Sequence, residues 1–283
     1  MGKFFKKKGR DMRLVIKASG EQEEFDSKKF RRSLLRVGAS EQDIDKLIKD
    51  VEENKDLVTT HDIYKYAFNY LSRIKASLAS RYNIKNAIFQ LGPSGFPFEL
   101  FLSKFFESLG YQTVIGRKLL GKCVTHEVDV VLKKDNNFYI VESKFHNAQG
   151  IKSDVKITLY IQARFLDINA DGHKEFYKAW AVTNTRFTSD AIQYANCVGM
   201  NIMDWNYPHN KSLSYFIDKL GLHPVTTLVS LSSKQKKDLI NNNIILCKQI
   251  IEDKNVLKIL KLSDKKIDKL ITEAQEVVSA FKN

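Results

Sequence analysis

The stretch from His126 to Lys144 carries three charged residues that could do chemistry within two otherwise apolar segments, namely Asp129, Glu142 and Lys144. Glu142 and Lys144 are two residues apart in a strand-like segment, so their side chains lie on the same face. Asp129 lies in the preceding segment and would approach Glu142 in an antiparallel pair. Two converging carboxylates repel each other unless a cation lies between them. Their oxygens suit Mg²⁺ or Mn²⁺, and a neighbouring lysine can orient a water or stabilise a developing phosphorane charge.

A commoner alternative exists for the same residues. A Glu-X-Lys sequence at the end of a strand is usually a solvated cross-strand pair on the protein surface. Phe138 and Ile140 precede Glu142 on its face, so this face changes from apolar to charged at the end of the strand. The residue types and their spacing leave both interpretations open.

Residues 93–223 contain the elements that must position these side chains. The segments "EVDVVL" and "NNFYIVESK" predict two antiparallel strands, and Asp135, Asn136 and Asn137 suit the hairpin turn between them. The whole block predicts a helix, a strand, this hairpin, and then helix, strand, helix and strand. The glycines and prolines of "GPSGFPF" predict a domain boundary before the block.

The block resembles the PD-(D/E)XK nuclease superfamily and, within it, the Mrr-like restriction endonucleases, over most of residues 93–210. "FPFELFLSKFFESLGY" matches the family's first helix, with Glu99 at its acidic position. "HEVDVV" supplies Asp129, and "VESK" supplies Glu142 and Lys144. The later "AWAVTNTRFTSDAIQYANCVGMNIMDW" is similar to the family's strand, helix and strand.

This resemblance implies a restriction-endonuclease-like α/β/α sandwich with a mixed sheet, and Mg²⁺-dependent hydrolysis of DNA phosphodiesters. Asp129 and Glu142 would bind the metal, Lys144 would position the attacking water, and Glu99 would act through groups next to the metal ligands. The following segment "KITLYIQARFLDI" predicts a helix on which Arg164 either contacts DNA or forms a structural ion pair. Cutting both strands requires two active sites, so a homodimer is expected.

Residues 1–92 predict a small α-rich domain that opens with a short strand, "RLVIKAS". Asp26 is a plausible N-cap of its first helix, and Thr59 or Thr60 of its third. The segments "VIKASGEQEEFDSKKFRRSLL" and "VTTHDIYKYAFNYL" resemble the ATP-cone, a regulatory nucleotide-binding domain, over about residues 12–91. The resemblance implies ATP or dATP as an effector, although Ala18 and Tyr64 depart from the family's pattern. The implied nucleotide contacts are Val15, Lys17, Gly20, Glu23, Asp26, Lys29 and Thr60.

Residues 224–283 predict helices only. This segment loosely resembles helix-hairpin-helix domains, which bind the DNA backbone, but "KLSDKK" replaces their glycine-containing turn. Lys261, Lys265 and Lys266 would be the basic contacts. Its leucine and isoleucine stripe equally fits a core or a dimer contact.

The chain of 283 residues has a formal net charge of +13, which favours polyanionic partners. This charge divides into +7, +2 and +4 over the three blocks (Lys+Arg 20, 15 and 11; Asp+Glu 13, 13 and 7). Three distant cysteines without a C-x-x-C pair predict neither disulfides nor zinc, and fit a reducing cytoplasm. No apolar run approaches the ~20 residues of a membrane span, and the basic residues 1–12 are expected to be a solvated tail rather than a secretory signal.

These patterns lead to a cytoplasmic, metal-dependent DNA endonuclease whose cutting an N-terminal nucleotide-binding domain regulates. One alternative is a nucleotide-responsive DNA-binding regulator with an inactive nuclease fold. Another is an assembly module whose first domain and last helices drive oligomerisation.

Overall fold

The computed structural model describes residues 13–17, 20–170 and 176–279 and divides the chain into two compact units, residues 1–74 and 75–283. The basic tail predicted for residues 1–12 lies outside the described residues, as does Ala18. Among the described residues, no helix combines the length and the apolar character that crossing a bilayer requires.

The first unit is a two-stranded sheet with three helices. Asp26 accepts a hydrogen bond from the Lys29 amide at the start of α1, as expected of an N-cap. Thr59 caps α3, because its Oγ1 accepts from the Asp62 amide at 3.0 Å. A second strand, not predicted, pairs antiparallel with the first. The elements are β1 (Leu14–Ile16), β2 (Gln22–Glu24), α1 (Ser27–Arg36), α2 (Glu41–Glu53) and α3 (Thr60–Ile74).

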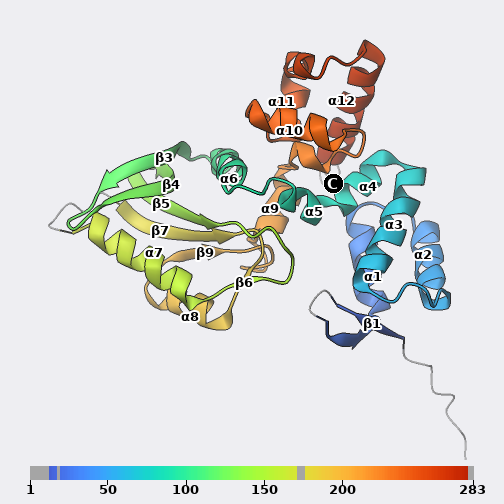
Figure 1. Cartoon of the computed structure of the whole chain (residues 1–283), viewed down its shortest axis with the longest axis horizontal. Coiled ribbons are helices and arrows are strands. Elements are labelled where there is room, and N and C mark those ends of the chain that lie inside the picture. Colours follow the sequence, from blue (N-terminus) through green and yellow to red (C-terminus); the bar gives the residue numbers. More distant parts are fainter. Residues whose placement is uncertain (1–12, 18–19, 171–175, 280–283) are drawn as a thin grey trace, which may run out of the picture. The chain divides into compact units, whose positions relative to one another are not determined.

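The second unit contains a mixed five-stranded sheet in the order β3-β4-β5-β7-β9 (Figure 1). The pairs β3–β4 and β4–β5 are antiparallel, and β5–β7 and β7–β9 are parallel, as the predicted mixed sheet requires. The strands are β3 (Gln112–Leu120), β4 (Thr125–Lys134), β5 (Asn137–Lys144), β7 (Phe176–Thr183) and β9 (Asn201–Met203). Two short strands, β6 (Lys152–Ser153) and β8 (Arg186–Phe187), form a separate parallel pair.

Helices cover both faces of this sheet. In β5, Ile140 and Val141 are fully buried on opposite faces, as alternation along a strand requires. Val141 packs in the core of α6 (Phe96–Ser108), whereas Ile140 packs in the core of α7 (Val155–Ile168) and α8 (Ser189–Cys197). Figure 1 shows α7 lying along the sheet. The α/β architecture with helices on two faces follows the expectation for this block.

The predicted hairpin joins β4 to β5 through a two-residue turn. Lys134 pairs with Asn137, and the residues between them, Asp135 and Asn136, have φ angles of 49° and 62°. Both angles are positive, as in the turns whose twist matches antiparallel strands, and Asp and Asn tolerate this conformation better than most residues. Asn137 therefore begins β5 and is not part of the turn.

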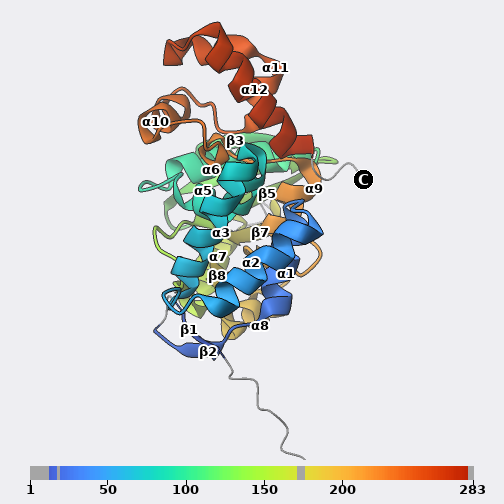
Figure 2. The same ribbon diagram turned by 90° about the vertical axis from the view of Figure 1, so that its right-hand side faces the viewer.

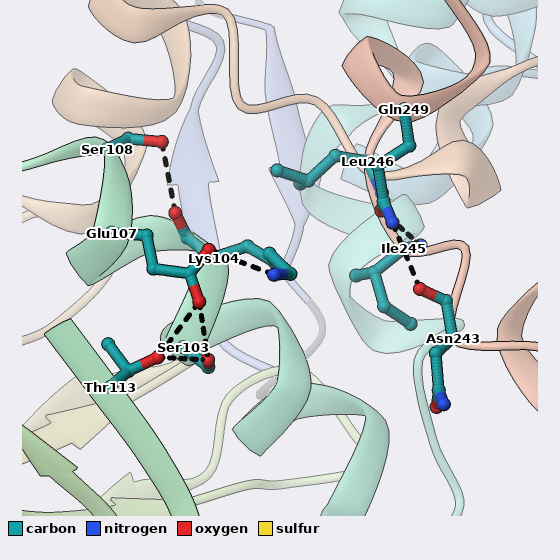
Figure 3. A network of polar contacts seen from close by, with 9 residues as sticks. All are labelled: Ser103, Lys104, Glu107, Ser108, Thr113, Asn243, Ile245, Leu246 and Gln249. Carbon is teal, nitrogen blue, oxygen red and sulfur yellow. Dashed lines mark hydrogen bonds and ion pairs between the residues drawn. The ribbon is translucent and has the colours of Figure 1, made fainter. Parts of the chain in front are cut away.

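A polar cluster fastens α6 to the edge strand β3 (Figure 3). The hydroxyl oxygens of Ser103 and Thr113 are 2.7 Å apart, and Thr113 Oγ1 donates to Glu107 Oε1 at 2.9 Å. Lys104 adds an ion pair to Glu107 at 2.9 Å. These contacts fix the helix that carries Glu99 against the sheet.

The helices before and after the sheet pack together in the second unit. Ser80 Oγ donates to Glu273 Oε1 at 2.7 Å, and Thr226 Oγ1 donates to the carbonyl of Ala87 at 2.7 Å. The boundary expected at residue 92 therefore lies inside this unit, and the chain separates at 74/75 instead. The single helix expected at "ASRYNIKNAIFQL" is two helices, α4 (Ala76–Tyr82) and α5 (Ile84–Phe89).

From Leu213 to the end of the described residues, every named element is a helix, as predicted for residues 224–283. In both views α11 lies beside α12 (Figures 1 and 2). Gln249 Oε1 accepts from the amides of Ile245 and Leu246 at 2.8 and 2.9 Å, so it caps the start of α11 (Figure 3). Lys261, with φ 49°, adopts the left-handed turn where a glycine was missing. The elements are α9 (Leu213–Leu220), η1 (Val225–Thr227), α10 (Ser233–Asn241), α11 (Cys247–Glu252), η2 (Lys254–Leu260) and α12 (Asp264–Ser279).

Candidate active site

The backbone pairing of β4 with β5 ends at Val130 and Val141, and Asp129 and Glu142 are the next residues on the two strands beyond this pair. There, a side chain on one strand bonds to the other strand. The amide and the hydroxyl of Ser143 both donate to Asp129 Oδ2, at 2.7 and 2.8 Å. The aspartate is therefore anchored to the neighbouring strand through one of its two oxygens.

Glu142 is anchored from α7 by Arg164. The guanidinium donates to Glu142 Oε1, and the side chains of Glu142 and Arg164 are only 10% and 12% exposed. Arg164 also donates to the carbonyl of Glu127 at 2.9 Å and to the hydroxyl of Tyr160, whose ring lies under the guanidinium. Of the two alternatives for Arg164, the structure places it in an ion pair.

Each of the two carboxylates keeps one oxygen without a hydrogen bond inside the described part of the chain. For Asp129 this atom is Oδ1, because Oδ2 accepts both bonds from Ser143. For Glu142 it is Oε2, because Oε1 accepts from Arg164. Both side chains are thus held in place, while each keeps one carboxylate oxygen that can coordinate a cation.

The carboxylates are close enough to affect one another's protonation. The pKa of Glu142 is raised to about 8, first by burial and then by the charge of Asp129, while Arg164 opposes this rise. Burial also raises the pKa of Glu99 to about 7, with contributions from the charges of Asp129 and Glu127. The three acidic residues singled out in the sequence therefore form one electrostatic group.

Lys144 ends β5 with an exposed side chain. Its ammonium forms neither an ion pair nor a hydrogen bond with any residue that the structure describes, so it can serve a bound molecule. His146, which the sequence reasoning missed, lies near it: burial and the charge of Lys144 lower the pKa of His146, and its Nε2 lies 2.9 Å from Ser153 Oγ. An imidazole close to Lys144 carries no spacing signal in the sequence.

The donor chemistry of this group fits a hard divalent cation. Carboxylate oxygens suit Mg²⁺ or Mn²⁺, and Mg²⁺ retains several waters when one or two carboxylates bind it. Over the described ranges, no three His, Cys, Asp or Glu side chains form a ready metal cage. Asp129 and Glu142 would consequently bind the ion as a pair, with water completing its shell.

The residues expected to contact a nucleotide lie in the first unit. Lys17 pairs with Glu23 at 2.7 Å and with Glu21 at 3.9 Å, so carboxylates of its own domain already neutralise it. Val15 is buried in β1, and Asp26 is engaged in capping α1. Of the remaining expected contacts, Gly20 has φ +85°, Lys29 is exposed on α1, and Thr60 is the first residue of α3.

Similarity to known proteins extends over much of the chain. A family model described as "AF1548-like, C-terminal" matches residues 223–278. An uncharacterized protein of Archaeoglobus fulgidus is 32% identical over 178 residues, which are 62% of this chain and 99% of that protein. The chain belongs to the AF1548-like family. The crystal structure of AF1548, a protein of unknown function, has a TM-score of 0.55 at 30% identity, over 65% of this chain and 98% of that one.

The AF1548-like family brings no named activity with it. A repair endonuclease from Pyrococcus abyssi shows a weak structural similarity, with a TM-score of 0.31 at 13% identity over 39% of this chain and 46% of that one. This TM-score is too low to support an argument about fold or function.

Proposed function

We propose that the chain is a metal-dependent DNA endonuclease of the PD-(D/E)XK type, with an Mrr-like catalytic domain. One observation carries the proposal: Asp129 and Glu142, on adjacent strands, are each anchored through one oxygen and each keep the other. Ser143 and Arg164 provide these anchors. Lys144 lies two residues after Glu142 on β5, and its ammonium has no protein partner among the described residues.

The roles of the side chains follow from their positions. Asp129 Oδ1 and Glu142 Oε2 would hold Mg²⁺ or Mn²⁺, which when bound polarises a phosphate and lowers the pKa of water. Lys144 would donate a hydrogen bond to the attacking water and balance charge on the phosphorane. Glu99, with a pKa of about 7, can accept or release a proton near Asp129 at neutral pH.

A cleavage assay tests the proposal directly. Supercoiled plasmid incubated with the whole chain and Mg²⁺ should be nicked or linearised, and EDTA should abolish the reaction. Asp129→Ala, Glu142→Ala and Lys144→Ala should each lose cleavage by a factor of about 10² or more. Lys118→Ala, which removes an exposed lysine of β3, is the matched control and should cut normally. Equal cutting by wild type and Lys144→Ala would refute the proposal.

The first unit is proposed to be an ATP-cone that responds to ATP or dATP. Support comes from the sequence pattern; Lys17 is paired with Glu21 and Glu23 and would have to exchange these carboxylates for phosphate oxygens. Calorimetric titration with ATP and with dATP, on wild type and Lys17→Ala, measures this binding. Cleavage at graded nucleotide concentrations then shows whether binding changes the cutting rate.

A second candidate function is a nucleotide-responsive DNA-binding regulator with an inactive nuclease fold. The buried Arg164–Glu142 pair favours it, because an internal cation already neutralises one of the two carboxylates. Under this hypothesis the chain binds duplex DNA in EDTA, Asp129→Ala binds equally well, and no cleavage occurs with any divalent metal.

Under the endonuclease proposal, cutting both strands would require a homodimer. Sedimentation of the chain with and without DNA tests for this dimer.

A further inference from the structure

A pocket of about 270 Å³ lies in the helical part of the second unit, away from the carboxylates of the candidate active site. Its polar lining consists of Ser230, Gln235, Lys266 and Lys269. The two lysines come from the first half of α12, and Gln235 comes from the first half of α10. Three leucines, at positions 231, 262 and 270, form the rest of the wall.

The two lysines of the pocket lack an internal counterion. Lys266 and Lys269 are three residues apart on one helix, so they share a face and repel each other. In the described part of the chain, neither ammonium forms an ion pair or a hydrogen bond. The buried carboxylate nearest in sequence, Glu273, is engaged elsewhere, because it accepts from Ser80 Oγ and from the amides of Val229 and Ser230.

The remaining polar groups of the pocket are donors as well. Gln235 Oε1 accepts from the Ser232 amide at 2.9 Å in a capping box, which leaves its NH₂ group for a ligand. Ser230 adds a hydroxyl. An oxyanion accepts hydrogen bonds from ammonium, amide and hydroxyl donors together, and bonds from a charged donor are roughly twice as strong as neutral ones.

The apolar wall constrains the rest of the ligand. Leu231 and Leu270 are 6% and 2% exposed, and with Leu262 they offer a small hydrophobic surface beside the lysines. Because Leu231 and Leu270 are nearly buried, the wall leaves room for only a small apolar group beside the phosphate, such as the sugar carbons of a nucleic-acid backbone.

We infer that this pocket binds a phosphate of a nucleic-acid backbone, with Lys266 and Lys269 as its cationic contacts. The excess of basic residues in residues 224–283, +4, agrees with such a partner. The inference rests on the proposed DNA partner but not on cleavage. Of the basic contacts expected from the sequence, Lys266 lines the pocket, whereas Lys261 and Lys265 do not.

Fluorescence anisotropy with a short labelled DNA duplex in EDTA tests the inference on the whole chain. Lys266→Gln/Lys269→Gln should weaken binding about tenfold, and should lower the slope of log K against log salt concentration by roughly 1, since the one phosphate contact that is lost contributes about 0.9. Lys254→Gln/Lys258→Gln removes the same charge from η2, outside the pocket, and should change binding less than threefold. Lys266→Arg/Lys269→Arg should retain binding, and equal melting temperatures exclude misfolding.

Three outcomes would overturn the inference. An equal loss in both glutamine variants would mean that only total charge matters, and no loss in the pocket variant would mean that the lysines do not contact DNA. Inorganic phosphate and a deoxynucleoside monophosphate are titrated as competitors. Saturable displacement of the duplex by either one at constant ionic strength would assign the pocket to a free phosphate compound instead. Because no metal is present, these results are independent of whether the chain cuts DNA.

Discussion

The guanidinium of Arg164 donates a hydrogen bond to Oε1 of Glu142, and both side chains are almost fully buried. One consequence concerns stability. A buried carboxylate that loses its cationic partner remains beside other carboxylates, and breaking such a pair typically costs several kcal/mol. The ion pair therefore links the integrity of α7 and the sheet to the candidate active site.

Arg164→Ala should lower the free energy of unfolding by roughly 3 kcal/mol, measured by urea denaturation without metal at a pH above 8, where Glu142, with a pKa of about 8, carries its charge. Adding Glu142→Gln to this variant should recover part of the loss, because the second change removes the unpaired charge. Saturating Mn²⁺ should raise the melting temperature of Arg164→Ala more than that of wild type, since the ion then supplies the missing positive charge. If the double variant is as unstable as the sum of the two single variants, the two residues are not coupled.

The raised pKa of Glu142 predicts a pH-dependent stability. The folded state binds the proton of this carboxyl with a pKa of about 8, against a usual value of 4.5, so it holds the proton more tightly than the unfolded state. This contribution is complete below pH 4.5 and is lost as the pH rises to 8. Glu99, with a pKa of about 7, adds to the same trend. Urea denaturation of the metal-free chain between pH 5 and 8 should show falling stability, with a flatter profile in Glu142→Gln.

Ser143→Ala should weaken the anchoring of Asp129 without removing it. The variant loses the 2.8 Å bond from the hydroxyl but keeps the 2.7 Å bond from the amide. A single hydrogen bond contributes about 1 kcal/mol, so we expect Mn²⁺ affinity, measured by calorimetry, to fall about fivefold. Ser108→Ala, which removes a hydroxyl bonded to the Lys104 carbonyl on α6, is the control and should leave the affinity unchanged.

Gly92→Ala should disturb the segment that follows Lys144. A Cβ at this position would lie 2.4 Å from Asn147 Oδ1 and 2.7 Å from the ring of Phe145, both of which belong to that segment. Overpacking of this kind costs about 1–3 kcal/mol, so the melting temperature should fall and cleavage should weaken with it. Gly95→Ala meets only Glu99 Oε1 at 3.4 Å and should change stability by less than about 0.5 kcal/mol.

Local signals in the sequence predict the parts of the fold that short-range physics determines. The β4–β5 hairpin was predictable because an apolar segment on each side meets Asp135 and Asn136, which accept positive φ. The helix start at Asp26 was predictable, and that of α3 to within one residue (Thr59 or Thr60), because the side chain of a cap bonds the backbone within three residues. The proximity of Asp129 to Glu142 followed from the same pairing.

Contacts between distant segments could not be predicted in this way. Arg164 reaches the carbonyl of Glu127 and the carboxylate of Glu142 because of the position at which α7 packs along the sheet. The spacing of residues within α7 does not determine this packing position, so the sequence alone left two roles open for Arg164. The bond from Ser80 to Glu273 spans 193 residues, and neither partner belongs to a motif. The boundary expected at residue 92 therefore came from a glycine- and proline-rich turn that lies inside one folded unit.

The union of α4 and α5 with the last helices has a consequence for how such a protein can be rearranged during evolution. A gene fusion or deletion with its breakpoint near residue 92 would remove the hydrogen bond from Ser80 to Glu273 and the hydrogen bond from Thr226 to the Ala87 carbonyl. A breakpoint at 74/75 severs neither contact. Exchange of residues 1–74 among relatives should therefore leave α4, α5 and the last helices together in one chain.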